Sequence, residues 1–228
     1  MKDQDHAKKN AGESSVDLIQ NGMTVGLGSG STVYWMLKQL GERAANGLDV
    51  KGVPSSQQTK GWAEAFGVPL TDFAHVKRLD LAIDGADEVD PQWQLVKGGG
   101  GALVREKIIA ASANSLIVII DESKTVSQLG AFPLPIEVVP FGWETTAERI
   151  TETGVEPVAR RNDAGELFVS DNGNYIVDCH FGTIREPRAL EKQINQLTGV
   201  VETGLFTDMA NNVIVGYPDR TETFGHSS

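Results

Sequence analysis

The strongest structural signal in this chain is the run Ser-Leu-Ile-Val-Ile-Ile at 115–120, which contains no charged residue. A continuous β-branched apolar run is typical of a strand that is buried on both faces of a parallel sheet. Parallel neighbours need crossover connections, which are usually helices. The chain must therefore supply other strands that alternate with helices, and this requirement predicts an α/β fold.

The first half of the chain supplies that alternation. Short apolar runs predict strands at 23–27, 48–53, 79–83 and 115–120. Helical spacing and capping residues predict helices at about 5–20, 32–40, 55–65 and 102–113. These segments together indicate a doubly wound, Rossmann-like sheet.

The pattern changes at Phe132-Pro133-Leu134-Pro135, where two prolines suit a link between domains. Strands are then predicted at 136–139, 158–160 with 166–170, 175–180 and 200–206, with helices at 143–153 and 187–197. The order β-α-β-β-α-β matches the split βαβ, ferredoxin-like unit. We therefore predict a Rossmann-like domain of residues 1–131 plus 206–228, and a smaller α+β domain of residues 132–205.

Composition argues against several classes of function. The net charge is −11, from 20 basic and 31 acidic residues, whereas nucleic acids and anionic membranes need a basic face. A single cysteine, Cys179, and four scattered histidines supply neither a disulfide nor a typical metal site. The sequence shows no apolar stretch that would span a bilayer and no secretory signal, so we expect a cytoplasmic protein.

The first chemical motif is Gly26-Leu27-Gly28-Ser29-Gly30-Ser31-Thr32, between a predicted strand and a predicted helix. Glycines let backbone N–H groups approach a ligand, and a helix N-terminus adds partial positive charge, so the loop suits a phosphate group. It lacks the lysine of a Walker A loop, and Ser31 stands where a dinucleotide fingerprint has its third glycine. A structural turn with helix caps is the alternative.

The second motif is Asp84-Gly85-Ala86-Asp87-Glu88, at the end of a predicted strand. Ligands of open α/β sheets bind outside the carboxyl ends of the strands. Two carboxylates there suit proton transfer or the binding of sugar hydroxyls. A solvated acidic turn or a metal loop is the alternative, although the spacing of an EF-hand is absent.

The third motif is Lys97 followed by four glycines, which lead directly into a predicted helix that carries Glu106. The neighbours of Glu106 on that helix are apolar or small, namely Ala102, Leu103, Ile109 and Ala110. Burial opposes ionisation of the carboxyl group and the helix N-terminus favours it, a balance that suits a base for carbon-acid chemistry. A flexible linker and a buried structural glutamate are the alternatives.

In this order and separation, the motifs resemble the type A ribose-5-phosphate isomerase family. The likeness extends to further stretches at 121–124, 132–138, 171–174 and 199–206. With the three motifs, the resemblance covers essentially the whole chain. Two departures are small. Ser29 stands where the family often has threonine, and Gly101 stands where alanine is common.

The resemblance implies an aldose–ketose isomerase that interconverts D-ribose 5-phosphate and D-ribulose 5-phosphate, in the pentose phosphate pathway, through a cis-enediolate. Glu106 would move the proton, and Asp84, Asp87 and Lys97 would hold the sugar and assist ring opening. The further substrate-binding positions that it implies are Ser29, Gly30, Ser31, Thr32, Gly85, Ala86, Gly98, Gly99, Gly100 and Lys124. No metal and no organic cofactor is implied, and the family forms homodimers or tetramers.

Two other readings stay open at this point. One is a different enzyme on the same layer, such as a sugar-phosphate deaminase or a coenzyme A transferase. The other is a non-catalytic module that senses sugar phosphates. Asp178 and His180 are predicted to share a face of one strand, which indicates packing or a dimer contact rather than a catalytic pair.

Overall fold

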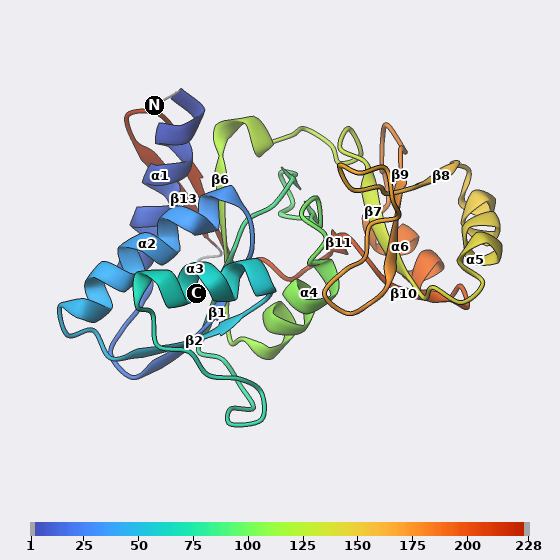
Figure 1. Cartoon of the computed structure of the whole chain (residues 1–228). Helices are drawn as coiled ribbons and strands as arrows, with labels where there is room; N and C mark the ends of the chain where they lie inside the picture. Colours follow the sequence, from blue (N-terminus) through green and yellow to red (C-terminus); the bar gives the residue numbers. More distant parts are fainter. Residues whose placement is uncertain (1–2, 226–228) are drawn as a thin grey trace. The chain divides into compact units, whose positions relative to one another are not determined.

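The computed structural model describes residues 3–225, which form two compact units (Figure 1). The first unit is made of the chain up to Ala86, of Arg105–Thr125, and of the chain from Met209 onwards. The second unit is made of Asp87–Val104 and Val126–Asp208.

A six-stranded sheet forms the centre of the first unit, in the order β13-β12-β6-β3-β1-β2. Its strands are β1 (Met23–Leu27), β2 (Val50–Pro54), β3 (Leu81–Asp84), β6 (Leu116–Asp121), β12 (Asn212–Gly216) and β13 (Thr221–Gly225). All neighbours are parallel except the β12–β13 pair. Every residue of β6 is buried, as the apolar run at 115–120 predicted.

Helices cover both faces of this sheet. They are α1 (Asp3–Ser15), α2 (Ser31–Ala45), α3 (Gln57–Phe66) and α4 (Leu103–Ser112), with short 3-10 helices at Val16–Leu18 and Glu122–Lys124. Val25 and Leu27 of β1 belong to the apolar core that includes residues of α2. Gly26 points to the opposite face, where a Cβ atom would lie 2.3 Å from Ile109 of α4.

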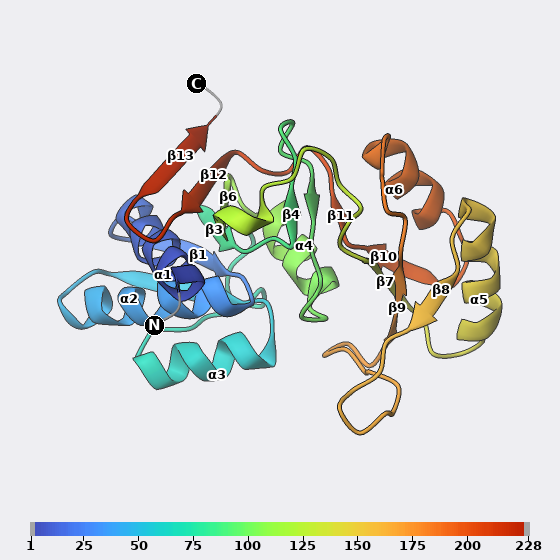
Figure 2. The same ribbon diagram turned by 90° about the horizontal axis from the view of Figure 1, so that it is seen from above.

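The second unit contains a four-stranded antiparallel sheet in the order β10-β7-β9-β8. Its strands are β7 (Leu134–Val138), β8 (Pro157–Ala159), β9 (Tyr175–Cys179) and β10 (Val200–Thr203). Two helices, α5 (Trp143–Ile150) and α6 (Pro187–Asn195), share a core with it, and a 3-10 helix spans Thr151–Thr153 (Figure 2). This β-α-β-β-α-β order is the split βαβ unit that the sequence predicts.

Two details of this unit differ from the expectation. Pro135 lies inside β7 and not in a linker. A proline in a strand has no N–H to donate, but its carbonyl oxygen can still accept a hydrogen bond, and Pro135 O accepts the Gly204 N–H at 2.7 Å. Residues 166–170 form isolated bridges and no strand. The Asn162 side chain accepts the N–H groups of Ala164 and Glu166, and such local bonds compete with a strand ladder.

The expected strand at 200–206 is divided at Gly204. A Cβ atom at this residue would lie 2.2 Å from Lys97 O, so the chain approaches its neighbour closely and changes sheets there. The residues beyond it form β11 (Leu205–Phe206), which pairs with β5 (Leu95–Val96), and β5 pairs with β4 (Glu88–Val89). This small antiparallel sheet was not predicted, and it carries the residues that flank Asp87 and Lys97.

Two helix-interior glycines allow a matched test of the packing. A Cβ atom at Gly12 of α1 would lie 2.7 Å from Thr32 O and 2.8 Å from Met36 N, both backbone atoms of α2, whereas Gly61 of α3 has no atom within 4 Å of that position. We expect Gly12→Ala to lower the free energy of unfolding by about 1–3 kcal/mol. We expect Gly61→Ala to raise it by about 0.5–1 kcal/mol.

Urea denaturation of both variants measures these changes. Equal effects of the two substitutions would contradict the close packing of α1 on α2.

Candidate active site

In the first unit, the candidate site is organised around Asp84, the last residue of β3. The residue is 3% exposed, and its Oδ1 accepts the backbone N–H groups of Ser29 at 3.0 Å and of Gly85 at 2.7 Å. A Cβ atom at Gly28 would lie 2.1 Å from the same oxygen. Glycine at position 28 is therefore required by the close approach of the Asp84 carboxylate.

The loop that precedes α2 ends at an exposed glycine. Gly30 has a φ of 104°, and α2 begins at the next residue, Ser31; both residues are exposed. This places the positive end of a 15-residue helix at the loop, as the phosphate-site prediction requires.

The Ser29 hydroxyl is engaged by a cluster of hydroxyl groups that sequence reasoning missed. Ser29 Oγ lies 2.7 Å from Ser55 Oγ, 2.9 Å from Ser56 Oγ and 3.1 Å from Thr59 Oγ1. Ser56 also caps α3 by accepting the Thr59 N–H. The capping residues that predict the helix at 55–65 were the only signal of this cluster in the sequence. The hydroxyl of Ser29 therefore fixes the loop to the hydroxyl groups of Ser55, Ser56 and Thr59.

Two further candidates lie in the first unit. Glu106 is in the first turn of α4 and is 5% exposed, and Ile109 and Ala110, one turn further on, are also buried. Lys124 is half-buried at the end of the 3-10 helix that follows β6. Asp121 caps that short helix by accepting the Ser123 N–H. Lys124 thus follows the carboxyl end of a parallel strand, as Ser29 does, and Asp84 is the last residue of such a strand.

In the second unit, Asp87 is joined to the glycine loop. Its backbone N–H donates to Val96 O, and its Oδ2 accepts the Gly99 N–H, both at 2.8 Å. Gly98 and Gly101 have φ values of 98° and 82°, which other residues rarely adopt. The glycines are therefore part of a specific loop conformation and not of a linker.

Lys97 lies between this loop and the small sheet. The residue is 3% exposed, and its backbone N–H donates to Gly204 O at 2.8 Å. The side-chain Nζ lies 5.3 Å from the centroid of the Phe206 ring. The neighbouring acid Glu88 was not predicted to have a role. Its carboxylate accepts the N–H groups of Gly130 and Phe132, each at 2.6 Å, and so anchors the chain that leads into β7.

The structure thus brings several predicted residues together within each unit: Ser29, Asp84 and Gly85 in the first, and Asp87 with Gly99 in the second. Within residues 3–225, no three His, Cys, Asp or Glu side chains are grouped as metal ligands would be. No helix of the same residues is long and apolar enough to cross a membrane.

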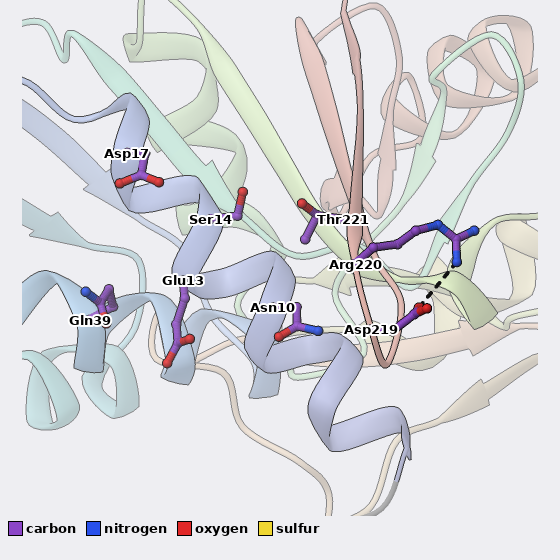
Figure 3. Close-up of a pocket in the computed structure, with 8 residues that line it drawn as sticks. All are labelled: Asn10, Glu13, Ser14, Asp17, Gln39, Asp219, Arg220 and Thr221. Atoms are coloured by element: carbon purple, nitrogen blue, oxygen red, sulfur yellow. Dashed lines mark hydrogen bonds and ion pairs between the residues drawn. The ribbon is translucent and has the colours of Figure 1, made fainter.

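A depression of about 430 Å³ in the first unit contains none of the predicted residues (Figure 3). It lies between α1, α2 and the β12–β13 hairpin, and its charged lining consists of Glu13, Asp17, Asp219 and Arg220. Arg220 already lies 3.3 Å from the Asp219 carboxylate. The excess of carboxylates makes this depression unfavourable for a phosphate dianion.

Asp178 and His180 form no hydrogen bond or ion pair with each other in the described structure, so they are not a catalytic pair. Asp178 is instead bound by Arg160, with Nε at 2.9 Å from Oδ2. The neighbouring Cys179 is fully buried, and burial, with a smaller contribution from the Asp178 charge, raises the pKa of its thiol to about 12. Cys179 is therefore a packing residue and not a nucleophile.

These features define an α/β protein with a Rossmann-like sheet and a split βαβ unit, in which acidic and glycine-rich loops follow the strand ends. A sequence model of the family described as ribose 5-phosphate isomerase A (phosphoriboisomerase A) matches residues 51–220. The "Ribose-5-phosphate isomerase A 1" of Oceanobacillus iheyensis is 54% identical over 221 residues, which cover 96% of this chain and 98% of that protein.

Solved structures give the same result. Ribose 5-phosphate isomerase A from Methanocaldococcus jannaschii superposes with a TM-score of 0.91 at 38% identity, covering 96% of this chain and 98% of that one. A D-ribose-5-phosphate isomerase in complex with phospho-erythronic acid superposes with a TM-score of 0.94 at 37% identity, covering 99% and 100%. This chain belongs to the ribose 5-phosphate isomerase A family, so the predicted resemblance and the predicted fold class are confirmed.

The buried thiol gives a direct test. With a pKa of about 12, the thiolate fraction of Cys179 at pH 8 is on the order of 10⁻⁴, and the sulfur is also inaccessible. We expect the native protein to react with a thiol reagent such as dithionitrobenzoate only after denaturation. Stoichiometric labelling of the native protein at pH 8 would contradict the burial of this residue.

Proposed function

We propose that this protein interconverts D-ribose 5-phosphate and D-ribulose 5-phosphate as an aldose–ketose isomerase of the pentose phosphate pathway. Membership of the ribose 5-phosphate isomerase A family supports this function. The observation that carries it is the buried carboxyl group of Glu106 in the first turn of α4. A carboxylate in such a place suits the removal of a proton from carbon.

Glu106 is the proposed base. Starting from the open-chain aldose, its carboxylate takes the proton from C2, and the electron pair moves through C1 to the carbonyl oxygen to give a cis-enediolate. The protonated Glu106 then returns the proton to C1 while O2 becomes the carbonyl of the ketose, after a proton has moved between the two oxygens. No atom is gained or lost, and no oxidant or reductant is needed.

The negative charge of the enediolate needs donors that are already in place. The ammonium group of Lys97 and the backbone N–H groups of the 98–100 loop are the proposed donors. Fixed donors of this kind stabilise a charge that develops during the reaction more than they stabilise the uncharged substrate.

The two aspartates are the proposed partners of the sugar hydroxyl groups. Opening of the furanose ring requires a proton to leave the anomeric hydroxyl and another to reach the ring oxygen, and a carboxylate can serve as the acceptor. Asp84 is held by the Ser29 and Gly85 N–H groups, and Asp87 by the Gly99 N–H, so both are oriented before substrate arrives. Gly85 and Ala86 would contribute backbone contacts to the sugar.

The phosphate group is proposed to bind at residues 29–32 and Lys124. The N–H groups at the start of α2, the exposed Ser31 hydroxyl and the Lys124 ammonium make this a local exception to the net charge of −11. In this chain the loop contributes mainly its backbone, since the Ser29 hydroxyl is bound by other hydroxyl groups.

We further propose a cytoplasmic homodimer, or a tetramer, that associates through the 132–205 domain, with residues 1–131 and 206–228 as the catalytic domain. Exposed apolar side chains of the described residues support this surface. Five of the nine large ones lie at 132–205, namely Val139, Phe141, Val158, Val169 and Val201. Phe141 is 95% exposed in the single chain, which an association between copies would explain.

The central test is the Glu106→Gln variant. Glutamine keeps the shape of the side chain but is not a base, so we expect kcat to fall by about 10²-fold or more while substrate still binds. A coupled assay with ribose 5-phosphate measures the rate, and calorimetry measures binding. The control is Glu64→Gln, an exposed glutamate of α3, which should leave both unchanged. Near-normal turnover of Glu106→Gln would remove Glu106 from the proposed role.

The same assay tests the expectation that no metal is involved. We expect the wild-type rate to persist after dialysis against EDTA, because the proposed steps use only side chains and backbone N–H groups. Loss of activity that added Mg²⁺ or Zn²⁺ restores would contradict this expectation. A wild-type protein that binds ribose 5-phosphate but does not turn it over would instead favour the sensing module.

A further inference from the structure

Arg160 follows directly after β8, and its side chain is fixed by a carboxylate on β9. Its Nε donates to Asp178 Oδ2 at 2.9 Å, and its Nη2 donates to the other oxygen of the same group. The two side chains are only 14% and 21% exposed. A two-bond pair between a guanidinium and a carboxylate fixes the plane of the guanidinium as well as its position.

The remaining terminal nitrogen of Arg160 reaches the glycine loop. Nη1 donates to Gly98 O at 2.9 Å and to Gly99 O at 3.1 Å. The ring of Phe168 has its centroid 5.8 Å from the guanidinium carbon, and a Cβ atom at Gly101 would lie 2.5 Å from the same ring. One guanidinium therefore joins β9, the segment after β8 and two consecutive carbonyl groups of the loop.

The direction of these carbonyl groups decides the direction of the N–H groups that follow them. In a trans peptide the C=O and the next N–H point to opposite sides, and no peptide bond of the described residues is cis. The Gly99 N–H accordingly points away from Arg160 and donates to Asp87 Oδ2 at 2.8 Å. By the same rule the Gly100 N–H is turned away from Arg160.

A glycine-rich loop needs such a restraint. Glycine has more backbone freedom than any other residue, and a peptide unit between two glycines can rotate at little steric cost. Rotation of the Gly98–Gly99 peptide would replace the N–H at Asp87 with a carbonyl oxygen. The positive charge on the carbonyl side also polarises the peptide and strengthens its N–H as a donor.

We propose that Arg160, oriented by Asp178, is a positioning residue that directs the N–H groups of Gly99 and Gly100 to Asp87 and to the enediolate oxygen. This inference rests on the isomerase function proposed above and extends it by a residue pair outside the catalytic motifs. Arg160 acts only through the glycine loop. Its loss should therefore affect the transition state more than the binding of substrate.

The kinetic test compares three single variants. We expect Arg160→Met to lower kcat by about 10–10²-fold with a much smaller change in KM. Arg160→Lys keeps the charge but cannot bind Asp178 and both carbonyl groups at once, so its kcat should be intermediate. The matched control is Arg161→Gln, because Arg161 is the exposed neighbour and donates only to Gly165 O in the described structure. Its kinetic constants should stay at the wild-type values.

A double-mutant cycle tests the role of Asp178. If Asp178 acts by orienting Arg160, then Asp178→Asn should lower kcat alone but add little to Arg160→Met. Fully additive losses, or a lower melting temperature with an unchanged kcat per folded molecule, would overturn the proposal in favour of a purely structural ion pair.

Hydrogen exchange tests the positioning without turnover. The Gly99 amide should exchange faster in Arg160→Met than in the wild type or in Arg161→Gln, as followed by NMR. Unchanged exchange of Gly99 would overturn the proposal even if activity fell. An inactive wild-type protein would contradict the proposed function, whereas this measurement would still decide whether Arg160 holds the loop.

Discussion

The hydrogen bonds from two backbone N–H groups to the Asp84 carboxylate are the contact around which the first unit's candidate site is arranged. They form only because the parallel sheet sets the ends of β1 and β3 side by side, and because residue 28 has no side chain to occupy the space of the carboxylate. The loop that follows is thereby fixed, and with it the start of α2. A change at Gly28 would disturb the predicted phosphate loop and the predicted catalytic acid together.

The second unit repeats this principle with different elements. Asp87 accepts an N–H from the glycine loop, and the peptide that provides it is bound on its other side by Arg160. Both units therefore orient a carboxylate with backbone amides, and in the second unit a charged side chain, Arg160, holds the peptide that donates. Backbone amides suit an acidic member of a sugar-phosphate isomerase family, because peptide dipoles supply positive potential without a change in the net charge of −11.

Local pattern was sufficient to predict much of the fold. The β-branched run of β6, the helical spacing of α2 and the position of Glu106 in the first turn of α4 all depend on neighbouring residues in the chain, and the structure has each of them. The two-residue strands β4 and β5 were missed because such short segments have no periodicity, and β11 was predicted only as the end of the 200–206 strand. Their pairing, and the division of the 200–206 strand, depend on the approach of Gly204 to Lys97, which are 107 residues apart in the numbering.

The sequence by itself therefore determined the layer architecture, the acidic and glycine-rich loops at the strand ends and, through the ordered motifs, the family. It did so because periodicity, glycine placement and strand-end acids are local properties of the chain. Only the tertiary structure decided which groups orient those loops. Arg160 lies 62 positions from Gly98 and 18 from Asp178, and their hydrogen bonds exist only once β8 and β9 have paired and the glycine loop has packed beside them. The sequence alone carries no signal of such a contact, because its three members share no motif.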